Sequence, residues 1–169
     1  FGRTISFVFK NYFAEVELRP NLTLEIIGND RDQSSFNNIE ALHNDVTQYG
    51  YYGGIRLLKA TIKRFFEYTK SNNLKLEDKN FSISYRSNIP HRVGLAGSSA
   101  IITACLRALL KFYNVQIPKP VMADFILKVE TEELNISAGL QDRVVQTYEG
   151  LVFMDFDKEL MEKDGHGLY

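Results

Sequence analysis

The sequence has 169 residues and is 44% hydrophobic, which is enough apolar material for one substantial core, so we expect a single domain. Twenty Lys and Arg residues against 21 Asp and Glu residues give a net charge of −1, which argues against a nucleic-acid partner or an anionic membrane partner. No apolar run approaches the roughly 18 to 20 residues of a membrane span, and the single Cys105 excludes an internal disulfide, so we expect a reduced, cytoplasmic protein.

Three strands are predicted near the start of the chain. Apolar residues alternate with polar residues in three short runs, 5–9, 16–18 and 22–26. Asn11-Tyr12 and Arg19-Pro20-Asn21 are turn signals between these runs. We therefore expect an antiparallel meander.

Two helices and a further strand follow. Residues 28–35 form a polar loop, and a modest helix over 38–48 ends at Gly50. The strongest helical periodicity of the chain covers 55–71, and alternation returns at 81–85. The alternation at 81–85 predicts a strand that leads to residues 89–100.

That segment, residues 89–100, reads Ile-Pro-His-Arg-Val-Gly-Leu-Ala-Gly-Ser-Ser-Ala and runs directly into an apolar helix. Gly94 and Gly97 allow positive φ and a close approach to a ligand, while Ser98 and Ser99 stand at the predicted N-cap and first turn. Glycines and serines also occur in ordinary loops and caps. The order of strand, glycine loop and helix favours a phosphate site, because the free N–H groups and dipole of a helix start attract anions.

The remaining pattern predicts helices over 99–113 and 120–134, a short helix over 139–148 and a final strand over 151–154. Cys105 falls inside the first of these helices, where a small core residue is expected.

Phosphoryl transfer needs a phosphate cradle, a divalent cation and a group that orients or deprotonates the acceptor hydroxyl. Ser99 supplies a hydroxyl beside the predicted cradle, the acidic run 129–133 supplies carboxylates, and Asp142 supplies a further acid. Acidic runs are often solvated helix faces, and a first-turn aspartate can simply stabilise a helix dipole, so both alternatives stay open.

The pattern Pro-x-x-x-Gly-Leu-Ala-Gly-Ser-Ser-Ala resembles the second motif of the GHMP small-molecule kinases, in which this loop wraps the nucleotide phosphates. The common form is Gly-Leu-Gly-Ser-Ser-Ala, so Ala96 makes this loop one residue longer. The resemblance implies the α+β fold of the GHMP kinase N-terminal lobe, a mixed and mostly antiparallel sheet with helices packed on one side. It also implies ATP contacts at Pro90, Val93, Gly94, Leu95, Ala96, Gly97, Ser98, Ser99 and Ala100.

The same resemblance implies a metal site and a base. A magnesium-binding glutamate precedes the catalytic aspartate in the family, and Glu130 stands at the matching distance before Asp142. Ser99 and Glu130 are therefore expected to hold Mg²⁺, and Asp142 is expected to be the base. Glu132 and Glu133 are substitutes for Glu130 if the helix end shifts.

Five blocks in order, 1–6, 50–58, 88–101, 138–144 and 150–156, are similar to the plant-type branch of the family that phosphorylates D-glucuronate at its anomeric hydroxyl. This similarity implies a sugar-acid 1-kinase that converts ATP and glucuronate to ADP and glucuronate 1-phosphate. ATP and a small-molecule sugar acid are the expected partners, and the oligomeric state stays open.

A carboxylate acceptor is expected to require a bidentate arginine, for which Arg143, Arg92 and Arg3 are candidates. His91 and Arg92 border the phosphate loop, where each is as consistent with a solvated residue as with a nucleotide contact.

The resemblance places the first family motif before Phe1 and the C-terminal lobe after Tyr169. Residues 1–169 are therefore expected to be the N-terminal, ATP-binding domain of a longer kinase, with little activity in isolation. Two alternatives remain: a kinase for a neutral sugar or another uronic acid, and a non-catalytic nucleotide-sensing module on the same fold.

Overall fold

The computed structural model describes residues 2–32, 34–51, 53–90 and 93–169. Its strands are β1 (Arg3–Phe7), β2 (Ala14–Asn21), β3 (Glu25–Ile27), β4 (Asn80–Ser87) and β5 (Leu151–Asp155). Its helices are α1 (Ile39–Tyr49), α2 (Ile55–Ser71), α3 (Gly97–Tyr113), α4 (Lys119–Lys128), the π-helical turn η1 (Val129–Glu133), α5 (Leu140–Tyr148) and α6 (Lys158–Asp164).

The larger sheet has the strand order β2-β4-β3. β2 runs antiparallel to β4, with Val16 opposite Tyr85, and β3 runs parallel to β4, with Ile26 opposite Ile83. A separate antiparallel ribbon joins β1 to β5. The mixed sheets and helices confirm the predicted fold class.

The predicted meander is wrong, because β4 lies between β2 and β3, and β1 pairs with β5 at the far end of the chain. Hydrophobic alternation identifies a strand and its buried face without identifying its partner. The turn predicted at 19–21 is also wrong, since these residues complete β2 and Pro20 pairs with Phe81. β2 is an edge strand, where a residue without an N–H is tolerated.

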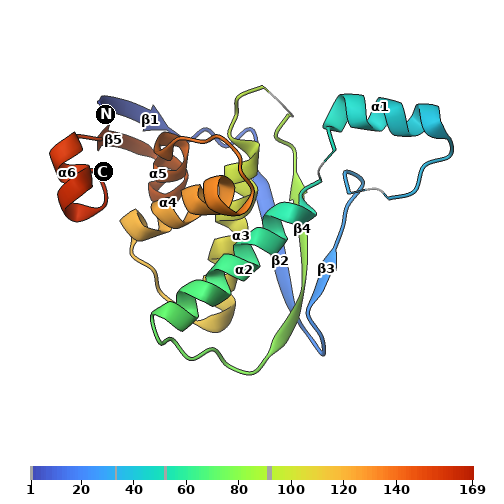
Figure 1. The fold of residues 1–169 in the computed structure, drawn as a ribbon, viewed down its shortest axis with the longest axis horizontal. Helices are drawn as coiled ribbons and strands as arrows, with labels where there is room; N and C mark the ends of the chain where they lie inside the picture. Colours follow the sequence, from blue (N-terminus) through green and yellow to red (C-terminus); the bar gives the residue numbers. More distant parts are fainter. Residues whose placement is uncertain (1, 33, 52, 91–92) are drawn as a thin grey trace.

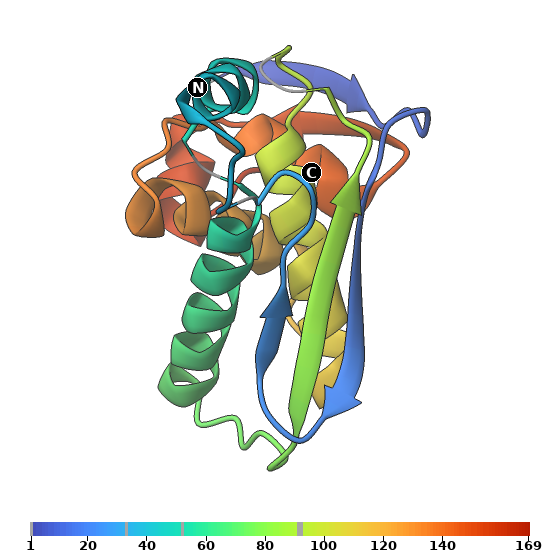
Figure 2. The ribbon, with the colours of Figure 1, turned by 90° about the vertical axis from the view of Figure 1, so that its right-hand side faces the viewer.

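Helices α2 and α3 cover one face of the larger sheet, as Figures 1 and 2 show. Phe81, Ile83 and Tyr85 of β4 are buried under these helices, and the intervening Ser82 and Ser84 lie on the opposite face. The same core takes apolar side chains from α2, α3 and α4, among them Leu58, Phe65, Ile102, Leu106, Leu109 and Ile126. The packing of α2 and α3 on the sheet therefore holds the first turn of α3 close to the last residues of β4.

A second, smaller apolar cluster packs α4 and α5 against the β1–β5 ribbon through Ala123, Val144, Val152 and Met154. The two ends of the described chain meet here, because the N–H of Phe156 donates to the carbonyl of Gly2 at 2.8 Å. Helix α6 follows β5 and was not predicted from the sequence. No helix in the part of the chain that the structure describes is long and apolar enough to cross a membrane.

The predicted helices are confirmed to within a few residues. Asn38 caps α1 by accepting a hydrogen bond from the N–H of Ala41, and Gly50 ends it with φ of 82°. The helix predicted over 120–134 is divided into α4 and the π-helical turn η1. A π-helical turn inside a helix is often associated with a functional site, and this one carries Glu130.

Candidate active site

The glycine loop connects the end of β4 to the start of α3. Gly94 has φ of 74°, as expected, but the second left-handed residue is Ala96, with φ of 52°, and not Gly97. Gly97 is already helical, and a Cβ there would lie 3.3 Å from the Ile89 side chain, so close packing explains this glycine. Ala96, the residue that lengthens the loop, therefore supplies the backbone reversal into α3.

The two serines at the start of α3 have different partners. Ser98 donates its hydroxyl to Oε1 of Glu130 at 2.5 Å, whereas Ser99 donates to the carbonyl of Ala96 at 2.9 Å. Neither caps the helix, because Ala96 is the N-cap and no side-chain cap hydrogen bond is formed there within the part of the chain that the structure describes. The structure thus places Ser98, and not Ser99, beside the candidate metal ligand, and it leaves the helix start open to an anion.

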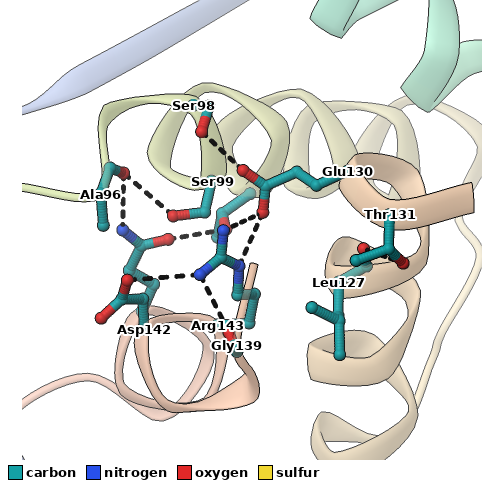
Figure 3. A network of polar contacts seen from close by, with 11 residues as sticks. Ala96, Ser98, Ser99, Leu127, Glu130, Thr131, Gly139, Asp142 and Arg143 are labelled. Carbon is teal, nitrogen blue, oxygen red and sulfur yellow. Dashed lines mark hydrogen bonds and ion pairs between the residues drawn. The ribbon is translucent and has the colours of Figure 1, made fainter. Parts of the chain in front are cut away.

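Glu130 is fully buried in the turn η1. Its Oε2 accepts from Arg143 at both Nε, at 2.6 Å, and Nη2, so two guanidinium N–H groups of the ion pair share one carboxylate oxygen. Its Oε1 accepts from Ser98, so both carboxylate oxygens have donors. Figure 3 shows the three side chains converging from α3, η1 and α5.

The neighbouring glutamates lie on another side of η1. Glu132 forms an ion pair with Arg64 at 2.7 Å, and Glu133 pairs with Lys63 at 2.8 Å and with Arg64 at 3.3 Å. These pairs attach η1 to helix α2. Glu130 is consequently the member of the acidic run that faces the glycine loop.

Arg143 bridges the two candidate carboxylates, as Figure 3 shows. Besides its contacts with Glu130, its Nη1 donates to Oδ2 of Asp142 at 3.2 Å and to the carbonyl of Gly139 at 2.9 Å. The Arg143 side chain is 6% exposed, while that of Asp142 is 50% exposed. These contacts occupy the guanidinium, so the structure does not support the expectation that Arg143 meets a substrate carboxylate.

Two further arginines were candidates for that role. Arg3 forms an ion pair with Asp155 at 2.7 Å, in the β1–β5 ribbon. Arg92 and His91 lie outside the residues that the structure describes. The nucleotide contacts expected from the resemblance, at Pro90 and residues 93–100, all lie within the described residues.

Cavities of about 540 Å³ and 550 Å³ lie on the two sides of the glycine loop. Ser98 lines the first, and Asp142 lines the second. Both cavities share four lining residues, Ile89, Gly94, Leu95 and Ala96. The loop is thus a wall between a space at the helix start and a space at the predicted base.

A buried network on the first cavity was missed by sequence reasoning. The hydroxyl of Tyr85 donates to Oδ2 of Asp32 at 2.7 Å and accepts from the N–H of Gly54 at 2.9 Å. Burial and the adjacent Asp32 carboxylate raise the pKa of Tyr85 well above its ordinary value. A Cβ on Gly53 would lie 1.9 Å from Asp32, and one on Gly54 would lie 2.2 Å from the Tyr85 ring. In the sequence, the adjacent glycines Gly53 and Gly54 were the signal that could have predicted this close packing.

The donor set fits a magnesium–triphosphate complex in part. Mg²⁺ prefers hard oxygen ligands and usually takes only one or two from protein, with phosphates and water supplying the others. Ser98 and Glu130 place a hydroxyl and a carboxylate oxygen together at the start of α3. Within the described residues no group of three His, Cys, Asp or Glu side chains could hold a metal by itself. The arrangement is therefore suited to a metal that arrives with phosphate.

Comparisons with known proteins identify the family and the fold. Residues 56–150 match the family described as the GHMP kinases N terminal domain. The whole chain is 49% identical to Glucuronokinase 1 and to Probable glucuronokinase 2 of Arabidopsis thaliana, and it covers 47% of each, so it spans about half the length of these relatives. A crystal structure of a D-glycero-D-manno-heptose 1-phosphate kinase from Bacteroides thetaiotaomicron has a TM-score of 0.64 at 19% identity, over 88% of this chain and 46% of that one, which shows a shared fold.

Proposed function

The chain belongs to the GHMP kinase family, and we propose that it supplies the N-terminal, ATP-binding domain of a sugar-acid 1-kinase that transfers the γ-phosphoryl group of ATP to the anomeric hydroxyl of D-glucuronate. The products would be ADP and glucuronate 1-phosphate. ATP and the sugar acid would be its small-molecule partners. Cys105 is buried and free, and burial raises the pKa of its thiol to about 12, which fits an unreactive core residue. The protein would be cytoplasmic, because a single unpaired cysteine suits a reducing compartment.

One observation carries the proposal. A single hydrogen-bonded network joins the helix that begins at the glycine loop to both acids that phosphoryl transfer requires, from Ser98 through Glu130 and Arg143 to Asp142. Such transfer depends mainly on positioning and charge neutralisation, and this network holds its parts from three separate elements. A nucleotide sensor would need the loop and not the exposed Asp142.

The loop residues 93–99 would bind the triphosphate with their backbone N–H groups at the start of α3. Ser98 and Glu130 would hold Mg²⁺, with Ser98 in place of the Ser99 expected from the sequence, because Ser98 lies beside the carboxylate. When bound, Mg²⁺ would neutralise the charge that develops on the phosphate oxygens. Asp142 would accept, or hold in line, the proton of the acceptor hydroxyl.

The acceptor would occupy the cavity of about 550 Å³ that Asp142 lines. Lys10 and Arg107 are the cationic side chains that line it among the described residues. Arg107 pairs with Glu149 at 2.6 Å, whereas Lys10 has no hydrogen bond or ion pair to the described part of the chain. Lys10 is therefore the better candidate to meet the carboxylate of a sugar acid.

An ATP-dependent ADP-release assay of the full-length protein, over a panel of neutral sugars and uronic acids, tests the proposal. We expect glucuronate to give the highest kcat/KM. A higher kcat/KM for a neutral sugar or for another uronic acid would contradict the proposed acceptor and support kinase activity on a different one. Nucleotide binding without ADP release on any acceptor would indicate the sensing module instead.

A further inference from the structure

Glu130 and Arg143 are the most deeply buried charged residues of the described chain, and their side chains have exposed fractions of 0% and 6%. A buried ion pair loses the hydration of both charges, so its contribution to stability is often small or negative compared with apolar residues of similar size. Stability alone is thus a weak explanation for placing this pair at the start of α3.

The contacts fix the guanidinium in one place. Two nitrogens of Arg143 bind Oε2 of Glu130, and the third binds Asp142 and the carbonyl of Gly139. Oε1 of Glu130 is left to Ser98, which lines the cavity at the helix start. A cation bound to Oε1 would therefore lie close to the positive charge of Arg143, which these contacts hold in place.

The formal charges of Glu130, Arg143 and Asp142 sum to −1, compared with −2 if Arg143 were neutral. A fixed positive charge a few ångströms away opposes a bare divalent cation, and at such a range one unit charge changes affinity by about tenfold or more. A metal that arrives on a triphosphate brings several negative charges, which the same arginine attracts.

We propose that Arg143 is a positioning residue that keeps bare divalent cations off Glu130 and admits the metal only together with a nucleotide triphosphate. This inference rests on the proposed function, because it assumes that Ser98 and Glu130 receive a metal–nucleotide complex. Arg143 acts through the two carboxylates that it holds, Glu130 and Asp142.

The test compares the binding of Mn²⁺ alone, followed by electron paramagnetic resonance, with the binding of Mg²⁺–ATP, followed by calorimetry. In the full-length Arg143→Met protein we expect the dissociation constant of Mn²⁺ alone to fall by about tenfold or more, while Mg²⁺–ATP binds more weakly. A site that is merely loosened would lose both ligands, so opposite changes are the signature of the charge. Arg143→Lys keeps the charge and should behave like the wild type toward bare Mn²⁺.

Arg64→Met is the matched control, because it removes a different arginine–glutamate contact from the same turn η1. It should alter thermal stability and leave both affinities unchanged. If Arg143→Met does not fold, Arg143→Gln removes the charge while still donating to Glu130, and it should show the same opposite changes.

Binding of bare Mn²⁺ that is no tighter in the folded neutral variant than in the wild type would overturn the inference. Opposite changes in a protein that phosphorylates no sugar acid would instead uphold the inference and remove the proposed acceptor. Activity on glucuronate together with unchanged metal binding would uphold the proposed acceptor and overturn the inference about Arg143.

Discussion

The hydroxyl of Ser98 lies 2.5 Å from a carboxylate oxygen of Glu130, although the two residues belong to different helical segments. The contact joins the start of α3 to the π-helical turn η1, at the edge of the cavity next to the glycine loop. A hydroxyl and a carboxylate in this relation form a two-oxygen site suited to a hard cation. Ser99, one residue along, points its hydroxyl back to the carbonyl of Ala96.

This relation separates the two serines experimentally. Ser98→Ala should raise the Mg²⁺ concentration needed for half-maximal activity by about tenfold, the effect of losing about 1.4 kcal/mol of metal binding. Ser99→Ala should leave the metal requirement unchanged and lower the free energy of unfolding by about 1 kcal/mol, because a buried hydrogen bond is lost. Mg²⁺ titrations and thermal melts of both variants check this, and the reverse pattern would restore Ser99 as the ligand.

The Tyr85–Asp32 hydrogen bond should stabilise the wall of the first cavity. Tyr85→Phe removes the hydroxyl that joins Asp32 to the N–H of Gly54, and we expect a loss of about 1 to 2 kcal/mol in the free energy of unfolding. The pKa of Tyr85 is raised in the folded protein, so this contribution is fully present below the ordinary pKa of 10.0 and is lost as the pH rises from there through the folded value. Denaturant melts of both proteins between neutral and alkaline pH measure the difference.

A wild-type advantage that disappears well below the ordinary pKa of tyrosine would contradict this account. Gly54→Ala serves as an independent probe of the same packing, since its Cβ would lie 2.2 Å from the Tyr85 ring. It should destabilise the protein even in the Tyr85→Phe background, because the ring remains.

Lys10 should set the preference for an acidic acceptor. Lys10→Ala should lower kcat/KM for glucuronate by about tenfold and leave kcat/KM for glucose nearly unchanged, because only the charged acceptor loses a partner. Lys128→Ala, on helix α4 and paired with Asp124, is a suitable control that should affect neither sugar. An equal loss on both sugars would indicate that Lys10 shapes the cavity without reading the carboxylate.

Local sequence patterns predicted the helices other than α6, the strand β4 and the position of the glycine loop, because periodicity and capping residues such as Asn38 act within a few residues of themselves. Strand partners were not predictable in the same way. β1 pairs with β5, although most of the chain separates the two strands in sequence. Nothing in the local alternation at residues 3–7 specifies that partner.

The candidate site divides along the same line. The resemblance to the GHMP kinases singled out Glu130 and Asp142, and the structure brings both to one network. The contacts of Ser98 and Arg143 depend on the direction of the Glu130 side chain, and Glu130 lies in the irregular turn η1, which departs from the α-helical repeat. Asp32 was read as part of a polar surface loop, and only its contact with Tyr85 reveals its role.

In the proposed mechanism Asp142 serves the acceptor hydroxyl, and the kcat of Asp142→Asn in the full-length protein measures that role. Asn keeps the shape of the side chain, can still accept from Arg143, and lacks the charge of a base. We expect thermal stability and ATP affinity to change little while kcat on glucuronate falls by about 10²-fold or more. Asp124→Asn, which removes the charge of an acid from a surface pair on α4, should leave kcat unchanged. A kcat for Asp142→Asn close to that of the wild type would remove Asp142 from the mechanism and contradict the proposed kinase site.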